Sequence, residues 1–486
     1  MKTGILTIGY VGIRYFLRAV LLPLFFIVGF TACDPNHIPD DDGTTDISEE
    51  ILAVNEWIDG VMKEVYLWSN KIPSSVNYKK EADPEELFNK MLYTEEDTWS
   101  WITDDWASYK KELEGTPVSM GYSPAFFYKN QVSNEVIIII RFVYKNSPAD
   151  KAGLKRGDII LTIDGQALND ENYYDLYSGP SYTVGLGTYH PDPDVFSSNG
   201  VSKTITAATV TANPVIHYEV KEIEGKRIGY LVYTDFTSGV NNSFLKSVDA
   251  VVDSFKQSAI TDLIIDLRYN PGGSPGTATY LASSVVPRYV VEDKKIFLKM
   301  VYNRNLQNYF ERQDDGDTDL HYRFAASAGN LNLSKVYFLT AKGTASASEA
   351  LITGLKPYMD VIMVGDTTRG KYTGAWVIPD TNEPPKHNWC IVPIVLKYSN
   401  ASGFTDFKNG IAPDIFAYDY LIPAYPFGNL NDGVLAAAIG KITGTQLLTT
   451  KSAVKKPVFT GSQELRPREM ERRETLIVPR KNMIGE

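Results

Sequence analysis

Hydrophobic positions recur with a helical period in the first folded stretch of the chain. Between residues 47 and 106, apolar residues are spaced as on one face of a helix, for example Val54, Ile58 and Val61. Trp and Tyr residues accompany them, and at this spacing they are more typical of a core than of a ligand site. The pattern predicts a small N-terminal helical domain over residues 46–111.

The pattern changes twice further along the chain. Short β-branched runs, such as residues 136–143, predict a β-rich second domain over residues 112–212. From residue 213 to 445, apolar strands such as 228–233 alternate with helical segments such as 244–255, which is typical of an α/β core. We therefore expect a multidomain α+β protein.

The two ends of the chain lack a core-forming pattern. Residues 33–45 are polar and acidic, which predicts a flexible tether. Residues 446–486 are rich in Lys, Arg and Glu and poor in apolar periodicity, so we expect this tail to be flexible or loosely packed.

The first 32 residues have the pattern of a signal peptide. Lys2, Arg14 and Arg18 lie among or ahead of the first apolar residues, and an uninterrupted apolar run covers 19–29. A transmembrane anchor is the alternative, but the run is shorter than the roughly 20 residues that span a bilayer. The small residues before Cys33 resemble the lipobox of bacterial lipoproteins. This resemblance implies lipidation of Cys33 and a lipid-anchored protein of the cell envelope.

Composition excludes several classes of protein. The chain is 43% hydrophobic, as folded proteins are, and its net charge of -11 argues against nucleic acid as a partner. Cys33 and Cys390 are its two cysteines, so no disulfide framework is expected. The five histidines include no His-Glu-x-x-His pattern, and we expect neither a metal nor an organic cofactor.

A binding module is indicated in the second domain. Residues 146–166, which contain Asn-Ser-Pro-Ala-Asp-Lys-Ala-Gly-Leu-Lys-Arg-Gly-Asp, closely resemble the body of a PDZ domain. Upstream, Met120, Gly121 and Tyr122 occupy the place of the PDZ carboxylate-binding loop. The resemblance implies that backbone N–H groups of this loop bind the free C-terminus of a peptide, which adds as a strand. An ordinary β-turn is the alternative for the loop alone.

A serine opens an apolar helix in the third domain. Ser346-x-x-Glu349 has the spacing of a capping box, which is common in proteins without catalytic function. A serine at a helix N-terminus is also well placed for nucleophilic attack, since N–H groups and the helix dipole stabilise an oxyanion there. Both interpretations are compatible.

The candidate base for this serine lies in a segment that nearly matches a phosphate-binding loop. Gly365, Gly370 and Lys371 have the spacing of Gly-x4-Gly-Lys, but Tyr372 occupies the Ser/Thr position. A phosphate-binding loop also needs a helix directly after the lysine, whereas Gly and Pro residues follow here. A nucleotide hydrolase is therefore disfavoured.

Four separated motifs resemble those of the S41 serine peptidases, the carboxy-terminal-processing and tail-specific proteases. Ser346 lies in Thr-Ala-Ser-Ala-Ser-Glu, and Lys371 follows it by 25 positions. Residues 266–273, Asp-Leu-Arg-Tyr-Asn-Pro-Gly-Gly, resemble the family's glycine-rich turn, and 410–414 its closing Gly-Ile-x-Pro-Asp element. The PDZ-like region precedes the core, and the resemblance covers most of residues 47–445.

The resemblance implies a ClpP/crotonase-like protease core over residues 213–445 and a serine endopeptidase acting on protein substrates. Ser346 would be the nucleophile and Lys371 the general base. Backbone N–H groups at Gly272 or Gly273 and at Ala347 would form the oxyanion hole. An amine with an ordinary pKa of about 10.4 must lose its proton for this role, and burial in an apolar site favours that loss.

The sequence departs from the family at one position. A glutamine usually follows the lysine by four residues, and Ala375 stands there instead. Thr373 or a backbone carbonyl could orient the amine in its place. The alternative is a degenerate enzyme that serves as an envelope adaptor and binds protein C-termini through its PDZ domain. None of the histidines lies in a motif that suggests a replacement base.

Overall fold

The computed structural model describes residues 47–130, 132–313, 317–445, 464–467 and 476–478. These belong to the second of two compact units of the chain, Asp46–Glu486. The expected signal peptide, the acidic tether and Cys33 lie outside the described residues. Within these ranges, no helix combines the length and apolarity needed to cross a membrane.

Helices dominate the first region, as the hydrophobic spacing predicts. Helix α1 begins after Ser48, whose hydroxyl accepts a hydrogen bond from the N–H of Ile51 at 3.3 Å. Val54 and Ile58 lie on its buried face. The elements are α1 (Glu49–Val65), η1 (Ser69–Lys71), η2 (Tyr78–Lys80), α2 (Pro84–Lys90), β1 (Trp101–Thr103) and α3 (Trp106–Leu113). Strand β1, which the spacing did not predict, pairs with β19 (Cys390–Val392) of the third region.

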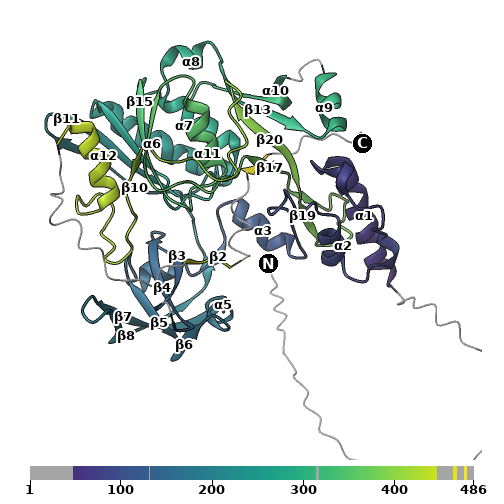
Figure 1. Ribbon diagram of the computed structural model, residues 1–486, viewed down its shortest axis with the longest axis horizontal. Coiled ribbons are helices and arrows are strands. Elements are labelled where there is room, and N and C mark those ends of the chain that lie inside the picture. The colour runs from purple at the N-terminus through teal and green to yellow at the C-terminus, as the bar shows by residue number, and fades with distance from the viewer. Residues whose placement is uncertain (1–46, 131, 314–316, 446–463, 468–475, 479–486) are drawn as a thin grey trace, which may run out of the picture. The chain divides into compact units, whose positions relative to one another are not determined.

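The second region is a β-sheet, as expected, in the order β22-β3-β4-β6-β5-β7-β8. Successive residues of β4 face opposite sides, and Ile137 and Ile138 are buried in different clusters. The elements are β2 (Val118–Ser119), β3 (Tyr122–Tyr128), β4 (Glu135–Val143), α4 (Pro148–Lys151), β5 (Ile159–Ile163), β6 (Gln166–Asn169), α5 (Tyr173–Tyr177), β7 (Ser181–His190), β8 (Val195–Thr206), β9 (Ala208–Thr209) and β22 (Glu464–Leu465) (Figure 1).

The third region is built on a six-stranded sheet in the order β10-β11-β12-β15-β16-β21. Strands β10 and β11 are antiparallel, and the remaining neighbours are parallel. The strands are β10 (Val215–Ile223), β11 (Lys226–Tyr233), β12 (Asp262–Asp266), β15 (Lys335–Thr340), β16 (Asp360–Gly365) and β21 (Ile415–Phe416).

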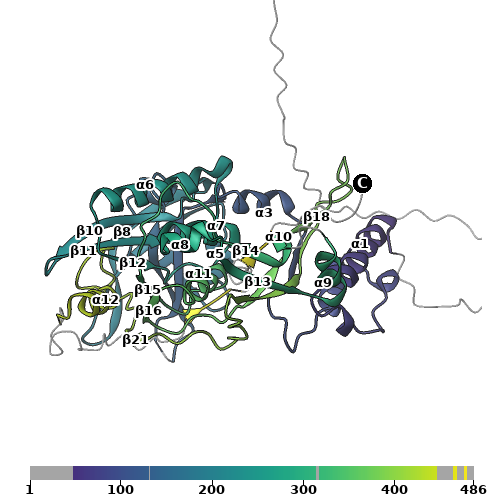
Figure 2. The same cartoon turned by 90° about the horizontal axis from the view of Figure 1, so that it is seen from above.

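Helices cover both faces of this sheet (Figure 2). Leu231 packs in the cluster that contains α6 (Ser243–Gln257), α7 (Pro275–Val285) and α11 (Ala347–Leu355). Its neighbour Tyr230 faces the opposite side and packs against α12 (Gly433–Thr443). This layering buries the sheet on both faces, which explains the nearly continuous apolar runs in its parallel strands.

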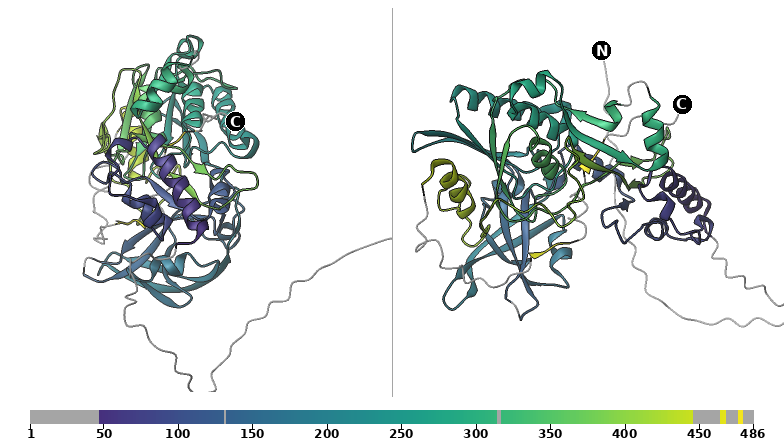
Figure 3. Two further views of the ribbon diagram at one scale, coloured as in Figure 1. Left: turned by 90° about the vertical axis from the view of Figure 1, so that its right-hand side faces the viewer. Right: turned by 45° about the horizontal axis from the view of Figure 1, so that its top comes forward.

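A second sheet of the third region lies beside α11, in the order β14-β13-β20-β17-β23. Its strands are β13 (Ile296–Tyr302), β14 (His321–Arg323), β17 (Thr373–Ala375), β20 (Ile394–Asn400) and β23 (Leu476–Ile477). The remaining elements are η3 (Val240–Asn242), α8 (Arg288–Glu292), α9 (Arg304–Glu311), α10 (Asp317–Leu320) and β18 (Ile378–Pro379) (Figure 3).

Two short pieces of the tail depart from the sequence-based expectation. We expected residues 446–486 to be flexible or loosely packed, yet β22 pairs with β3 and β23 pairs with β17. Backbone hydrogen bonds to distant strands order these two pieces, and strands of two residues are too short to leave a periodic signal.

Candidate active site

Ser346 stands at the turn between β15 and α11 with an unusual backbone. Its φ of 57° and ψ of -111° are rare for a residue with a side chain, and such conformations cost about 1–3 kcal/mol. The side chain is fully buried. Among the described residues, its hydroxyl oxygen has no hydrogen-bond partner. The turn therefore holds a hydroxyl that is not engaged in capping the helix.

Lys371 lies in the turn between β16 and β17, and its side chain is fully buried. Gly370 precedes it with a φ of 96°, and a Cβ there would lie 2.4 Å from the carbonyl oxygen of Lys408. Glycine is therefore required at this turn. The Gly-Ile-x-Pro-Asp segment supports the turn, because the N–H of Ile411 donates to Oγ1 of Thr368 at 2.8 Å.

A single carboxylate connects the two candidate catalytic residues. Oε2 of Glu349 accepts hydrogen bonds from the N–H groups of Ser346 and Lys371, at 2.8 Å and 2.9 Å. Its Oε1 accepts from Oγ1 of Thr368 and from the N–H of Gly370, both at 2.6 Å. Glu349, the acidic residue of the predicted capping box, thus accepts from the N–H of Ser346 as predicted. The same carboxylate also fixes the turn that carries Lys371.

A tyrosine hydroxyl makes a second connection between the same residues. Oη of Tyr398, on β20, lies 3.0 Å from the carbonyl oxygen of Ser346 and 3.0 Å from that of Lys371. Burial raises the pKa of Tyr398 well above its ordinary value, so the hydroxyl keeps its proton and donates. Ser346 and Lys371 are therefore joined on both the N–H and the carbonyl side of the backbone.

The connecting carboxyl is sensitive to pH. Burial raises the pKa of Glu349 from 4.5 to about 7, and the hydrogen bonds that it accepts oppose this shift. The folded protein holds the proton more tightly than the unfolded chain. The free energy of unfolding therefore falls as the pH rises from about 4.5 to about 7 on account of this group. Below about pH 7 the folded protein carries the proton on this carboxyl, and the oxygen that holds it becomes a donor, which weakens the connection.

The glycine-rich turn lies against the serine. A Cβ at Gly272 would lie 2.7 Å from Cβ of Ser346 and 3.0 Å from the nitrogen of Ala347. The N–H of Gly272 donates to Oδ1 of Asn270 at 2.9 Å. Of the two predicted glycine donors, Gly272 therefore already has an acceptor for its N–H. Gly273 and Ala347 remain, and Ala347 is the first residue of α11, where a helix leaves the N–H without an internal acceptor.

Two side chains hold the glycine-rich turn in place. Arg268 is buried and forms ion pairs with Asp266, Asp419 and Asp432 at 2.7, 2.8 and 2.8 Å. The amide nitrogen of Asn270 donates to the carbonyl of the neighbouring strand β11, at 3.0 Å. Such a network is costly to break at one partner only, so it fixes the turn against the core.

The lysine amine faces an aromatic ring from the first region. Nζ of Lys371 lies 4.2 Å from the centroid of Trp99. An amine over a tryptophan face is stabilised in its charged form. The turn that carries Trp99 is fixed by Asp97 and Ser100, and Oγ of Ser100 accepts from the N–H of Ile394 at 2.8 Å. This contact therefore favours the protonated amine, which must lose its proton before it can act as a base.

The position of the missing glutamine offers no amide to Lys371. Ala375 is fully buried on β17 and belongs to a cluster with Trp101 and Val392. Oγ1 of Thr373 is buried, and within the described residues it has no hydrogen-bond partner. The suggested replacement by Thr373 is thus not made in this state.

The predicted peptide-binding loop leads into β3. The carbonyls of Met120 and Gly121 accept hydrogen bonds inside the domain, from Ala149 and Tyr144, both at 2.9 Å. Gly121 has a φ of 81°, which favours glycine. Tyr122 begins the strand, and its hydroxyl pairs with that of Tyr182 at 2.9 Å. The loop is thereby fixed at the start of β3, whose other edge pairs with β22.

Three family models match the chain. Residues 227–417 match peptidase family S41, residues 53–101 match the peptidase S41 N-terminal domain, and residues 139–182 match a PDZ domain. The order of the three agrees with the order predicted from the motifs. Ser346 and Lys371 both fall inside the S41 match.

Curated relatives are carboxy-terminal processing proteases. CtpB of Bacillus subtilis is 28% identical over 50% of this chain and 45% of its own length. The carboxyl-terminal-processing protease of a Picosynechococcus is 28% identical over 58% of this chain and 60% of its own length. The chain thus spans about half the length of these relatives.

A solved structure shares the fold over most of the chain. The crystal structure of a putative S41 protease from Bacteroides fragilis is 25% identical, has a TM-score of 0.65, and covers 80% of this chain and 97% of its own. Residues 227–417 are thus similar to peptidase family S41, and matches to the S41 N-terminal domain and to a PDZ domain lie ahead of them in the chain.

Proposed function

We propose that the chain is a serine endopeptidase that cleaves protein substrates near their C-termini, with Ser346 as nucleophile and Lys371 as general base. One observation carries this proposal. A carboxylate and a tyrosine hydroxyl each join these two residues, at a strained turn that leaves the serine hydroxyl unengaged. A glutamate that only capped the helix would not also need hydrogen bonds to the turn that carries Lys371. The names of the curated relatives support the preference for C-termini.

The reaction proceeds through an acyl-enzyme. The amine of Lys371, once neutral, takes the proton of the Ser346 hydroxyl while Oγ bonds to the substrate carbonyl carbon. The tetrahedral intermediate then breaks its C–N bond, and the ammonium gives the proton to the leaving nitrogen. Water attacks the resulting ester and gives a proton to the amine, and the ammonium returns that proton to Oγ of Ser346.

Two backbone N–H groups would stabilise the negative charge on the carbonyl oxygen. Ala347 supplies one at the start of α11, and Gly273 supplies the other from the glycine-rich turn. Losing one oxyanion donor typically costs 10²- to 10³-fold in rate. Because Arg268 and Asn270 hold the glycine turn, both donors would be in place before the substrate arrives.

The PDZ domain would bind the free C-terminus of the substrate. A peptide would add to the edge of β3, and the N–H groups around residues 120–122 would receive its carboxylate. The binding module and the peptidase core would then act on the same end of one polypeptide.

A cleavage assay tests the proposed function against the adaptor alternative. The purified chain is incubated with β-casein, an unfolded protein, and the products are identified by mass spectrometry. We expect new C-termini that accumulate with time. Binding of β-casein without any new terminus would favour the adaptor and contradict the proposal.

Glu349 gives a prediction about positioning. Glu349→Gln preserves shape, but its NH₂ group must face one of the two pairs of donors, so two of four hydrogen bonds are lost. We expect kcat to fall at least tenfold with a smaller change in KM, and stability to fall by about 2–3 kcal/mol. The wild-type rate should also rise as pH passes through about 7, where the carboxyl ionises, and the variant should lack this step.

Thr353→Val is the matched control for this variant. Thr353 lies on the same helix, and its hydroxyl donates to the carbonyl of Glu349 at 2.7 Å without touching Ser346 or Lys371. The control should keep both the wild-type kcat and the step near pH 7. An unchanged pH profile in Glu349→Gln would show that the carboxyl does not position the dyad.

We also propose that the chain is a lipoprotein anchored through Cys33. The apolar run over residues 19–29 and the small residues before Cys33 support this. In a bacterium that processes lipoproteins, Cys33→Ser should move the protein from the membrane pellet to the soluble fraction. Cys390→Ser, at a buried cysteine, should stay in the pellet. Intact-mass detection of an unprocessed, unlipidated N-terminus in native membranes would contradict the anchor.

A further inference from the structure

The C-terminal tail occupies the edge of the PDZ strand that a peptide would use. Strand β22 pairs with β3 in the antiparallel direction, with Leu465 opposite Phe126 and Glu464 opposite Phe127. The tail therefore runs toward the loop at residues 120–122. Its direction and partner strand are those of a peptide that adds to this edge with its C-terminal side at the loop.

The PDZ region contacts the side chains of Glu464 and Leu465 as well as their backbone. Glu464 forms an ion pair with Arg141 of β4, and the guanidinium of Arg141 also donates to the carbonyl of Pro124 at 2.9 Å. Leu465 packs against the buried cluster that contains Phe126. The edge of β3 thus accepts an acidic residue followed by an apolar one.

A second piece of the tail lies between the two halves of the candidate active site. Strand β23 runs parallel to β17, with Ile477 beside Ala375. The N–H of Ile477 donates to the carbonyl of Gly273, and the N–H of Val478 donates to the carbonyl of Ala375, both at 3.0 Å. The segment is therefore bound on one side to the oxyanion turn and on the other to the strand after Lys371.

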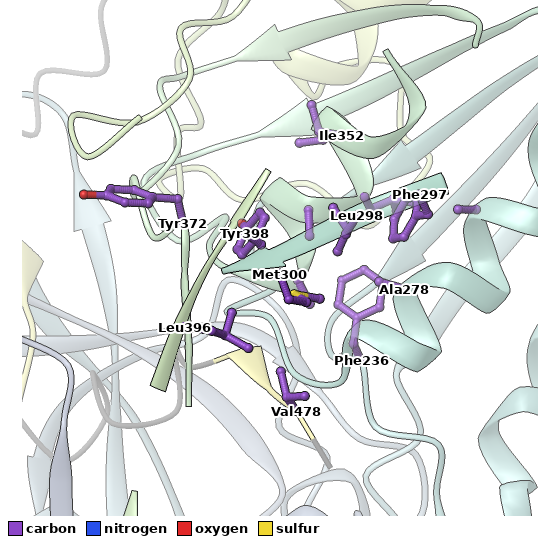
Figure 4. Close-up of a cluster of buried hydrophobic side chains, with 14 of the residues drawn as sticks. Phe236, Ala278, Phe297, Leu298, Met300, Ile352, Tyr372, Leu396, Tyr398 and Val478 are labelled. Atoms are coloured by element: carbon purple, nitrogen blue, oxygen red, sulfur yellow. The ribbon is translucent and has the colours of Figure 1, made fainter. Parts of the chain in front are cut away.

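The side chain of Val478 is inserted into the core beside this segment. It is 6% exposed and belongs to the buried cluster that contains Phe236 and Leu396. Figure 4 shows the three residues in that cluster, with Tyr398 nearby. An apolar side chain held beside the catalytic turn is what a substrate residue would present there.

We propose that two pieces of the tail, residues 464–465 and 476–478, are an intramolecular peptide ligand at both substrate positions, the edge of β3 and the position between Gly273 and β17, and so limit substrate access. The limit on substrate access rests on the proposed function, whereas the occupancy of the two positions does not. The two positions accept an extended peptide with an acidic-apolar pair at the PDZ edge and a β-branched apolar residue between Gly273 and β17.

The expected effect follows from tethering. A tethered segment has an effective concentration of about 1 mM, and a weak peptide site has an affinity of about 0.1 mM. The tail would then fill the sites about ten times more often than it leaves them open. A competing peptide would bind about tenfold more weakly to the full chain than to a chain without the tail.

A binding measurement tests the occupancy without catalysis. The probe is a fluorescent synthetic peptide that copies residues 464–478, and the protein carries Ser346→Ala. We expect at least tenfold tighter binding when the chain ends at Thr445 than when it is complete. Equal affinity for both proteins would overturn the inference.

Point variants guard against misfolding of the shortened chain. Ile477→Pro removes the N–H that donates to Gly273, so the complete chain should approach the shortened one in peptide affinity. Ile477→Val keeps the N–H and an apolar side chain, and it should bind the probe as weakly as the unaltered tail. Identical behaviour of the Pro and Val variants would contradict the proposal.

Activity separates this inference from the proposed function. With Ser346 intact, the shortened chain should cleave β-casein several-fold faster than the complete chain, and the unlabelled 464–478 peptide should suppress that gain. Tighter probe binding without any cleavage would uphold the tail as a ligand and overturn the peptidase. Cleavage with equal probe binding would uphold the peptidase and overturn the tail as a ligand.

Discussion

Ser346→Ala should remove peptide hydrolysis and leave the fold intact. The hydroxyl is the atom that forms the acyl bond, so we expect the rate to fall at least about 10⁴-fold. Because that hydroxyl makes no hydrogen bond among the described residues, its loss should change the free energy of unfolding by less than about 1 kcal/mol. Cleavage of β-casein and thermal unfolding, measured on the same preparation, check both parts.

Ser283→Ala is the matched control for this substitution. Ser283 is also a buried serine at a helix, and its hydroxyl donates to the carbonyl of Thr279 at 2.7 Å, away from the candidate site. This control should keep the wild-type rate although it loses two hydrogen bonds, since the hydroxyl also accepts from the N–H of Ala325 at 3.2 Å. If Ser346→Ala retains more than a small fraction of wild-type turnover, the nucleophile is another residue.

Lys371→Arg should be as inactive as Lys371→Met, which is a result that a purely electrostatic role would not give. Arginine keeps the positive charge but stays protonated at any working pH, so it cannot take the proton of Ser346. Methionine fills the fully buried site without a charge or a proton acceptor. We expect both variants to lose at least 10³-fold in rate, as measured with β-casein.

The pH profile of the wild type completes this test. A lysine acts as a base only in its neutral form, so the rate should rise with pH. Ionisation of Glu349 near pH 7 acts in the same direction, and Glu349→Gln should therefore shift only the lower part of the rise. Substantial activity of Lys371→Arg would refute the dyad and return the search for a base to the histidines.

The nucleophile and base candidates could be predicted because short motifs surround them. The 25-residue spacing between Ser346 and Lys371 and the glycine-rich turn at 266–273 depend on local sequence. The alternation of strands and helices likewise predicted β11 and α6 to within a few residues. These features are encoded by periodicity and turn chemistry, which a single sequence carries.

The connections between the motifs could not be predicted in the same way. Tyr398 lies 27 residues after Lys371 on an antiparallel strand, with no motif around it. Trp99 comes from the first region, and its approach to Lys371 depends on the pairing of β1 with β19. Glu349 was expected to cap a helix, and its contact with the lysine turn appears only when the two turns meet in the fold.

The tail shows the same limit more strongly. Its composition is that of an exposed segment, and two short strands carry no periodicity to detect. The two strands are held in place by partners more than 100 residues away, as in the pairing of Leu476 with Gly374. Long-range backbone hydrogen bonds of this kind depend on the folded edge that receives them.

Covalent labelling of the serine is the most direct test of the central claim. The complete chain and the chain that ends at Thr445 are treated with a serine-reactive phosphonate probe, digested and mapped by mass spectrometry. The dyad predicts one adduct, on the peptide that contains Ser346, with labelling that is lost in Ser346→Ala and strongly slowed in Lys371→Met. An adduct on a different serine, or no adduct on either chain while β-casein is still cleaved, would contradict Ser346 as the nucleophile.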